Sequence, residues 1–125
     1  MSTSTAPAPA IPVDASLHER VFEMVSSTAS VVDPHSPSRF AYYEEDGVIW
    51  GAYEGDTVVV GRFVGHRAGD TLAINFVHRG VDGGVTAGEG RSVISIAPDG
   101  ALVLTEDFEG PNGTPEVSVC REVRA

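Results

Sequence analysis

Apolar and polar residues alternate along most of the chain, which predicts β-strands. The alternating runs are separated by short turn sequences that include "EDG", "EGD", "AGD", "DGG", "PDG" and "GPNG". Gly, Asp and Asn turns at such short spacing are typical of antiparallel hairpins. The predicted strands cover residues 39–45, 48–54, 57–67, 70–79, 84–97, 101–109 and 115–124.

The segment before these strands predicts a helix. Ser16 and Glu19 have the S-x-x-E spacing of a capping box, and apolar residues then recur at helical intervals. Those apolar residues are Leu17, Val21, Met24 and Val25. We therefore expect a helix over about 17–27 that ends before the prolines of "DPHSPS".

The first residues of the chain differ in composition from the rest. Residues 1–13 are rich in Ser, Thr, Ala and Pro, and they have neither the basic start nor the apolar block of a signal peptide. We expect them to be a disordered leader. Residues 14–125 then form a single domain, which is long enough to bury a core.

The order of the elements predicts how the strands are connected. No helix separates consecutive strands, so parallel topology is excluded and an up-and-down meander is expected. Seven strands, several of them long, are expected to curl and close because closure removes exposed edges. The predicted fold is all-β: an antiparallel up-and-down β-barrel whose N-terminal helix plugs or flanks one end. A flattened sandwich is the alternative.

The stretch "VVVGRFVGHR", residues 58–67, has two faces that compete for the interior. A two-residue turn at Ala68-Gly69 pairs its glycine face with the apolar face of the next strand and turns Arg62 and His66 to solvent. The turns at "EDG", "EGD" and "PDG" extend the same inner face to other strands. This predicted inner face consists of Phe40, Tyr42, Ile49, Gly51, Tyr53, Val59, Gly61, Phe63, Gly65, Leu72, Ile74, Phe76, Ile94, Ile96, Leu102, Leu104 and Phe108.

Several glycines fall on this inner face. They are Gly51, Gly61, Gly65 and one of Gly88 and Gly90. A glycine within a strand bends it and makes room for an aromatic ring opposite. It also leaves volume for a ligand, and the two interpretations are compatible.

A few polar residues continue the apolar face. His78 follows Phe76 by two positions, Glu106 lies between Leu104 and Phe108, and Arg121 joins the face if the last strand points its valines inward. An unpaired carboxylate in an apolar interior is costly, so we expect Glu106 to pair with Arg121 or His78. That pair would be either structural or part of a ligand site.

These residues form the predicted site. Glu106 and His78 are the candidates for a catalytic base and acid. The candidates for ligand binding are Tyr42, Tyr53, Phe63, Phe76, Ser92 and Arg121. A rim position for His78, solvated and without a catalytic role, is the simpler alternative.

Composition excludes several classes of function. A net charge of −10 argues against nucleic acid as a partner. No apolar run approaches the roughly 20 residues of a membrane-spanning helix. The single cysteine, Cys120, precludes an intramolecular disulfide, and a reducing cytoplasm is the expected compartment. Trp50 opposite Tyr43 on the outer face suggests a self-association surface for a homodimer.

Neither a metal nor an organic cofactor is expected. The four histidines lack the spacing of a zinc site, and the glycine-rich stretches do not have the pattern of a phosphate-binding loop. Acetyl-CoA is commonly held at a helix N-terminus that follows a glycine-containing turn, and the chain has no such strand–helix unit. We therefore expect that the protein is not an acetyltransferase.

A longer pattern is similar to a known group of proteins. The tyrosine-containing first hairpin "FAYYEEDGVIWGAYEGD", the "GRFVG" pair of glycines and the "DGALVLTEDF" strand together span residues 40–109. They resemble a family of small bacterial proteins that carry the label n-acetylglutamate synthase. The resemblance implies a calycin-like or related small β-barrel, and it implies no catalytic residue.

Three functions fit this sequence. The first is a barrel that binds a small, mainly apolar or planar molecule in an aromatic cavity relieved by glycine. The second is a cofactor-independent enzyme of a biosynthetic pathway (a cyclase, isomerase or dehydratase) that uses Glu106, His78 and the tyrosines to move protons. The third is a structural barrel that its own side chains fill. The volume of the interior separates the third from the other two.

Overall fold

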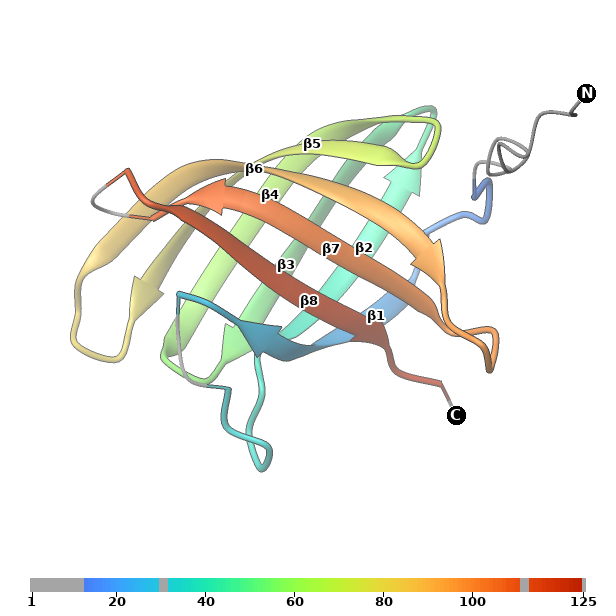
Figure 1. Ribbon diagram of the computed structural model, residues 1–125. Coiled ribbons are helices and arrows are strands. Elements are labelled where there is room, and N and C mark those ends of the chain that lie inside the picture. The colour runs from blue at the N-terminus through green and yellow to red at the C-terminus, as the bar shows by residue number, and fades with distance from the viewer. Residues whose placement is uncertain (1–12, 30–31, 111–112, 125) are drawn as a thin grey trace, which may run out of the picture.

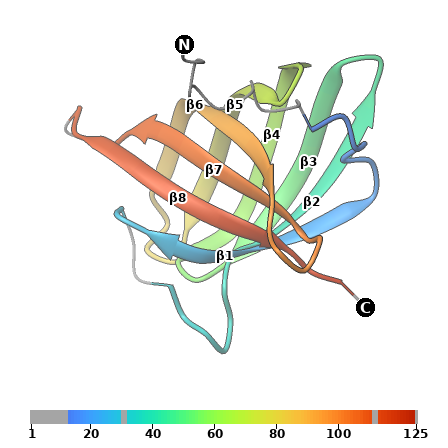
Figure 2. The same ribbon diagram turned by 45° about the vertical axis from the view of Figure 1, so that its right-hand side comes forward.

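The fold is a closed antiparallel β-barrel of eight strands (Figure 1). The computed structural model describes residues 13–29, 32–110 and 113–124. The strands are β1 (Arg20–Ser27), β2 (Arg39–Glu45), β3 (Val48–Gly55), β4 (Val58–Ala68), β5 (Thr71–Gly80), β6 (Val85–Ile96), β7 (Leu102–Glu109) and β8 (Pro115–Glu122). Each pairs with its neighbour in sequence, and β1 also pairs with β8 (Figure 2). The predicted up-and-down barrel is therefore confirmed.

The predicted helix over 17–27 is wrong. The described residues contain no helix, and most of this segment forms β1. The Ser16 hydroxyl does accept a hydrogen bond from the His18 amide at 3.0 Å, as a capping residue would, but Glu19 has a φ of 60° and turns the chain away from a helix. β1 then pairs with the edges of β2 and β8, which would otherwise be open. Strand pairing outweighs the local helical pattern.

The leader predicted for 1–13 lies outside the described residues except for Val13. Among the described residues, no helix is both long and apolar enough to cross a membrane.

The predicted register holds at two of the hairpins. Tyr42 faces Gly51 across the β2–β3 hairpin, and Ile94 faces Leu104 across the β6–β7 hairpin. The β4–β5 hairpin is offset by two residues, because its turn is Gly69-Asp70 rather than Ala68-Gly69. An even offset keeps the same face inside, so Arg62 and His66 are exposed as predicted.

Two residues of the predicted inner face lie outside. Val59 is 52% exposed because the β3–β4 and β4–β5 registers both shift beside it, and Val58 packs against the core instead. A β-bulge of this kind changes which side chains point inward. Ile96 is also exposed, since it lies at the end of β6.

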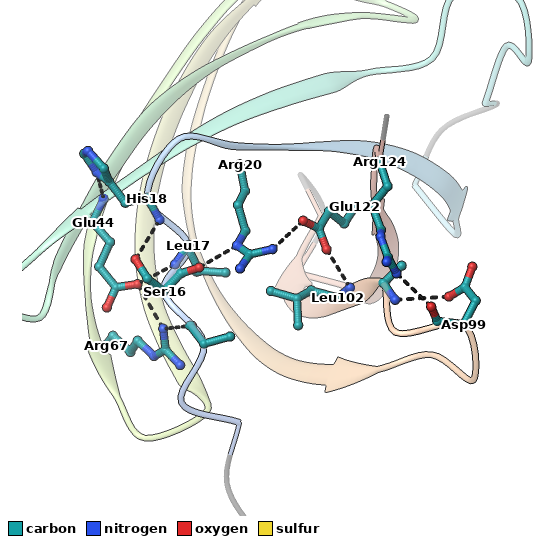
Figure 3. A network of polar contacts seen from close by, with 12 residues as sticks. Ser16, Leu17, His18, Arg20, Glu44, Arg67, Asp99, Leu102, Glu122 and Arg124 are labelled. Carbon is teal, nitrogen blue, oxygen red and sulfur yellow. Dashed lines mark hydrogen bonds and ion pairs between the residues drawn. The ribbon is translucent and has the colours of Figure 1, made fainter.

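The N-terminal residues 13–19 close one end of the barrel. Leu17 is fully buried in the core, and its amide donates to Glu44 Oε1 at 2.9 Å. The Arg67 guanidinium donates to the same carboxylate oxygen at 2.9 Å and to the carbonyls of Val13 and Ala15 (Figure 3). The segment is thus held in place by hydrogen bonds to β2 and β4, and the predicted plug exists as an extended segment.

The outer face carries the predicted aromatic pair. The Tyr43 and Trp50 rings stack at a centroid distance of 5.9 Å, and both are partly exposed. The homodimer that this pair suggests stays a prediction.

We expect Arg67→Gln to lower the free energy of unfolding by about 3 kcal/mol, because it leaves the Glu44 carboxylate with no cation at a largely buried position. Arg121→Gln is the matched control, since Arg121 forms an exposed ion pair with Asp99 on the outer surface. The control should lose much less, because solvent screens an exposed ion pair. Urea denaturation measures both, and equal losses would show that the plug is not held by Arg67.

Candidate functional site

A cavity of about 860 Å³ occupies the half of the barrel opposite the N-terminal plug. Its walls come from the ends of β1, β3, β5 and β7 and from the beginnings of β2, β4, β6 and β8. Leu17, Glu44 and Arg67, which belong to the plug, do not line it. Val85 and Thr86, which do line it, are exposed, so the cavity opens to solvent at this end.

Aromatic side chains form the inner wall. The rings of Phe40 and Tyr53 stack at a centroid distance of 4.8 Å, and those of Tyr42 and Phe63 lie 4.5 Å apart. On the other side, Phe76 and Phe108 meet edge to face at 6.4 Å. All of these residues line the cavity. Four of them were predicted to bind a ligand: Tyr42, Tyr53, Phe63 and Phe76.

Glycines lie directly beneath several of these rings. A Cβ on Gly61 would lie 2.5 Å from a carbon of the Tyr53 ring, and a Cβ on Gly88 would lie 2.9 Å from the Phe76 ring. Each ring can therefore lie flat against the neighbouring strand instead of projecting across the barrel. The two interpretations of the inward glycines hold together, because the room made for the rings leaves the centre open.

A hydrogen bond joins two of the polar groups. The Tyr53 hydroxyl lies 2.8 Å from His78 Nδ1, and the tautomer of the imidazole decides which group donates. Burial lowers the pKa of His78, so the ring is neutral at pH 7. Burial, followed by the nearby charge of Glu106, raises the pKa of Tyr53. His78 lines the cavity, and the pair is uncharged near neutral pH.

Glu106 has no cationic partner. Its carboxylate lies over Gly90 and lines the cavity, and it forms no hydrogen bond or ion pair with the residues that the structure describes. Burial, with a smaller contribution from the charge of Asp107, raises the pKa of Glu106 to about 7. The predicted pairing with Arg121 or His78 is wrong, because His78 bonds to Tyr53 and Arg121 lies elsewhere.

The last strand has the opposite orientation to the predicted one. β8 pairs with β7 so that Ser118 faces Glu106 and Cys120 faces Leu104. Both residues are buried, and the Arg121 side chain points outward to Asp99. The prediction that Arg121 points into the barrel is therefore wrong. Cys120 is a core residue, and burial, with a contribution from the charge of Glu106, raises the pKa of its thiol to about 12.

Ser92 lies beside the cavity rather than in its wall. It is fully buried and faces Glu106 across the β6–β7 ladder, as predicted, but it does not line the cavity. Sequence reasoning missed Ser118 as a lining residue because it assigned β8 the wrong face. It also missed Glu89 and Glu109 at the mouth, because the alternation of side chains along β6 and β7 predicts that both point to the outer face. Glu109 is the last residue of β7 and Glu89 lies in the first half of β6, and both are part of the cavity lining.

The chemistry of this lining suits an organic ligand. Within the described residues, no three His, Cys, Asp or Glu side chains gather as metal ligands. The cavity offers aromatic faces, the Tyr42 hydroxyl, the Tyr53–His78 pair and one buried carboxylate that titrates near pH 7. These groups can bind a planar molecule, and the carboxylate can accept a proton.

The raised pKa of Glu106 predicts a pH-dependent stability. The folded protein holds this proton up to about pH 7, whereas an unfolded Glu loses it near pH 4.5, so the free energy of unfolding should fall as pH rises between these values. We expect Glu106→Gln to raise that free energy by about 2–3 kcal/mol at pH 8 and to change it little at pH 4. Urea denaturation at both pH values measures the difference. Equal effects at the two pH values would contradict a buried, unpaired carboxylate.

The chain was compared with known proteins. A model of the family described as avidin-like proteins matches residues 15–123, which include all eight strands. No curated protein and no solved structure matches the chain.

Proposed function

Because the chain belongs to the avidin-like family, we propose that its barrel binds a small, mainly apolar or planar molecule in the aromatic cavity. The observation that carries this proposal is the open volume of about 860 Å³ behind the mouth. Ligand pockets commonly measure about 300–1,000 Å³ and are mostly apolar, with a few polar groups. A barrel filled by its own side chains would lack such a volume.

The wall residues suggest how such a ligand would lie. The stacked Phe40 and Tyr53 and the Phe76–Phe108 pair offer apolar faces to a planar body. The Tyr42 hydroxyl and the Glu106 carboxylate offer polar contacts at the inner wall. Of the residues predicted to bind a ligand, Ser92 and Arg121 have no place in this arrangement.

A second candidate function is catalysis without a cofactor, and the pKa of Glu106 favours it. A carboxylate with a pKa of about 7 is matched to proton transfer at neutral pH. Glu106 would act as the base, and the Tyr53–His78 pair would return a proton to the substrate. Cyclisation, isomerisation and dehydration all require such transfers, so the same cavity would serve a cyclase, isomerase or lyase.

Binding can be tested with a neutral, planar fluorescent probe, N-phenylnaphthylamine. We expect it to bind one site per barrel with a Kd on the order of micromolar. Thr86→Trp should abolish binding, because Thr86 lines the mouth beside β5 and a tryptophan would fill it. Val93→Trp is the matched control, since Val93 lies on the same strand but is exposed and outside the cavity.

Two results would contradict the proposal. The first is no fluorescence increase with the parent protein together with no co-purified small molecule in native mass spectrometry. The second is equal loss of binding in Thr86→Trp and Val93→Trp. Once a ligand is known, Glu106→Gln separates the two functions, because binding kept with turnover lost identifies an enzyme.

A further inference from the structure

The charged groups of the cavity are all of one sign. The ionisable carboxylates in its lining are Glu89, Glu106 and Glu109. Neither Arg nor Lys is among the described lining residues, and the whole chain contains no lysine. His78 is neutral at pH 7, because burial lowers its pKa. An anionic ligand would therefore meet only like charges at the mouth and at the wall.

Four of the eight arginines form polar contacts elsewhere in the barrel. Arg20 pairs with Glu122 at 2.5 Å, Arg67 with Glu44 and Arg121 with Asp99. Figure 3 shows that Arg20, Arg67 and Arg124 lie among the polar contacts of the plugged end. None of the eight arginines is among the residues that line the cavity, and none forms an ion pair with Glu106.

A second polar group in the cavity is also without a partner. Tyr42 is only 6% exposed, lines the cavity, and forms no hydrogen bond through its hydroxyl within the described parts of the chain. Burial raises its pKa, so the hydroxyl stays neutral and its oxygen can accept a hydrogen bond. No fully enclosed side-chain oxygen or nitrogen of the described residues lacks a hydrogen-bond partner, so the Tyr42 and Glu106 oxygens are exposed to the open space of the cavity. Both can therefore accept hydrogen bonds from a ligand that lies there.

We propose that the ligand of this cavity is an organic amine whose ammonium group pairs with Glu106 and whose apolar body lies against the aromatic wall. The inference rests on the proposed function and names its ligand class. A carboxylate beside aromatic faces is a strong arrangement for an organic cation, because ion pairing and cation–π attraction act together in a desolvated site. The Tyr42 oxygen accepts a further N–H.

Three naphthalene derivatives of matched shape test this proposal: naphthylmethylamine, naphthalenemethanol and naphthoate. Isothermal titration calorimetry at pH 8 should show the amine binding at least about tenfold more tightly than the alcohol, with the carboxylate weakest. Glu106→Gln should weaken amine binding at least about tenfold and leave alcohol binding within about threefold. Asp107→Asn is the matched control, since its exposed carboxylate is next in the chain and does not line the cavity.

The amine should also show a particular pH profile. Glu106 must lose its proton to pair with an ammonium, so amine affinity should fall about tenfold per unit below pH 7 and level off above it. Tyr42, Tyr53 and Cys120 face Glu106 from other strands with raised pKa values and stay neutral over this range. Alcohol binding should not change with pH.

Equal affinities for amine and alcohol, or equal losses in Glu106→Gln and Asp107→Asn, would overturn the amine proposal. Binding of N-phenylnaphthylamine without binding of naphthylmethylamine would overturn it as well and leave the proposed function standing. Failure of every probe would overturn both.

Discussion

β1 forms backbone hydrogen bonds with β2 along one edge and with β8 along the other, and this double pairing turns a meander into a barrel. Closure fixes the faces of all the strands at once, because every inward side chain must agree with those of both neighbours. It places Phe22 of β1 in the core and orients β8 so that Ser118 and Cys120 are buried. Arg121 is thereby turned outward, and Glu106 has no cation beside it. The central feature of the site is thus a consequence of how the barrel closes.

The two ends of the barrel differ in how their polar groups are satisfied. At the plugged end, the Glu44 carboxylate accepts from Arg67 and from the Leu17 amide, and the Glu122 carboxylate accepts from Arg20 and from the Leu102 amide. At the open end, the Tyr42 hydroxyl and the Glu106 carboxylate accept no such bonds within the described chain. The hydrogen bonds of the plugged end stabilise the fold, whereas the polar groups of the open end are available to a ligand. Both ends carry carboxylates, but the one that lines the cavity, Glu106, has no arginine paired with it.

Much of this architecture was predictable, because local turn chemistry sets register without knowledge of the rest of the fold. Asp46 and Gly47 both adopt positive φ in a two-residue turn, and the β2–β3 pairs follow as predicted. The "PDG" turn likewise sets the β6–β7 pairs as predicted, including Ser92 opposite Glu106. From the β2–β3 hairpin, the inward positions of Tyr42, Tyr53 and Gly51 could be derived.

The errors that change the type or the inward face of a segment occur where strand pairing decides, whereas the misplaced β4–β5 turn leaves the face unchanged. β1 precedes the long segment 28–38, and its pairing with β2 and β8 determines that it is a strand. Its local pattern of apolar residues therefore predicted a helix wrongly. The connection before β8 has the same length as that between β6 and β7, but the alternating valines of β8 fit either face until β1 and β7 select one. The bulge beside Val59 depends on the pairing of β4 with both β3 and β5, and the local sequence does not predict it. Each of these features is set by contacts between segments that are distant in sequence.

The proposed site depends most directly on Glu106 facing the cavity without a counterion. An NMR titration of its side-chain carboxyl carbon in selectively labelled protein measures the pKa of this group. We predict a midpoint near pH 7, well above the 4.5 of an ordinary glutamate. A midpoint at or below 4.5 would show a solvated or cation-paired carboxylate and would contradict the proposed site.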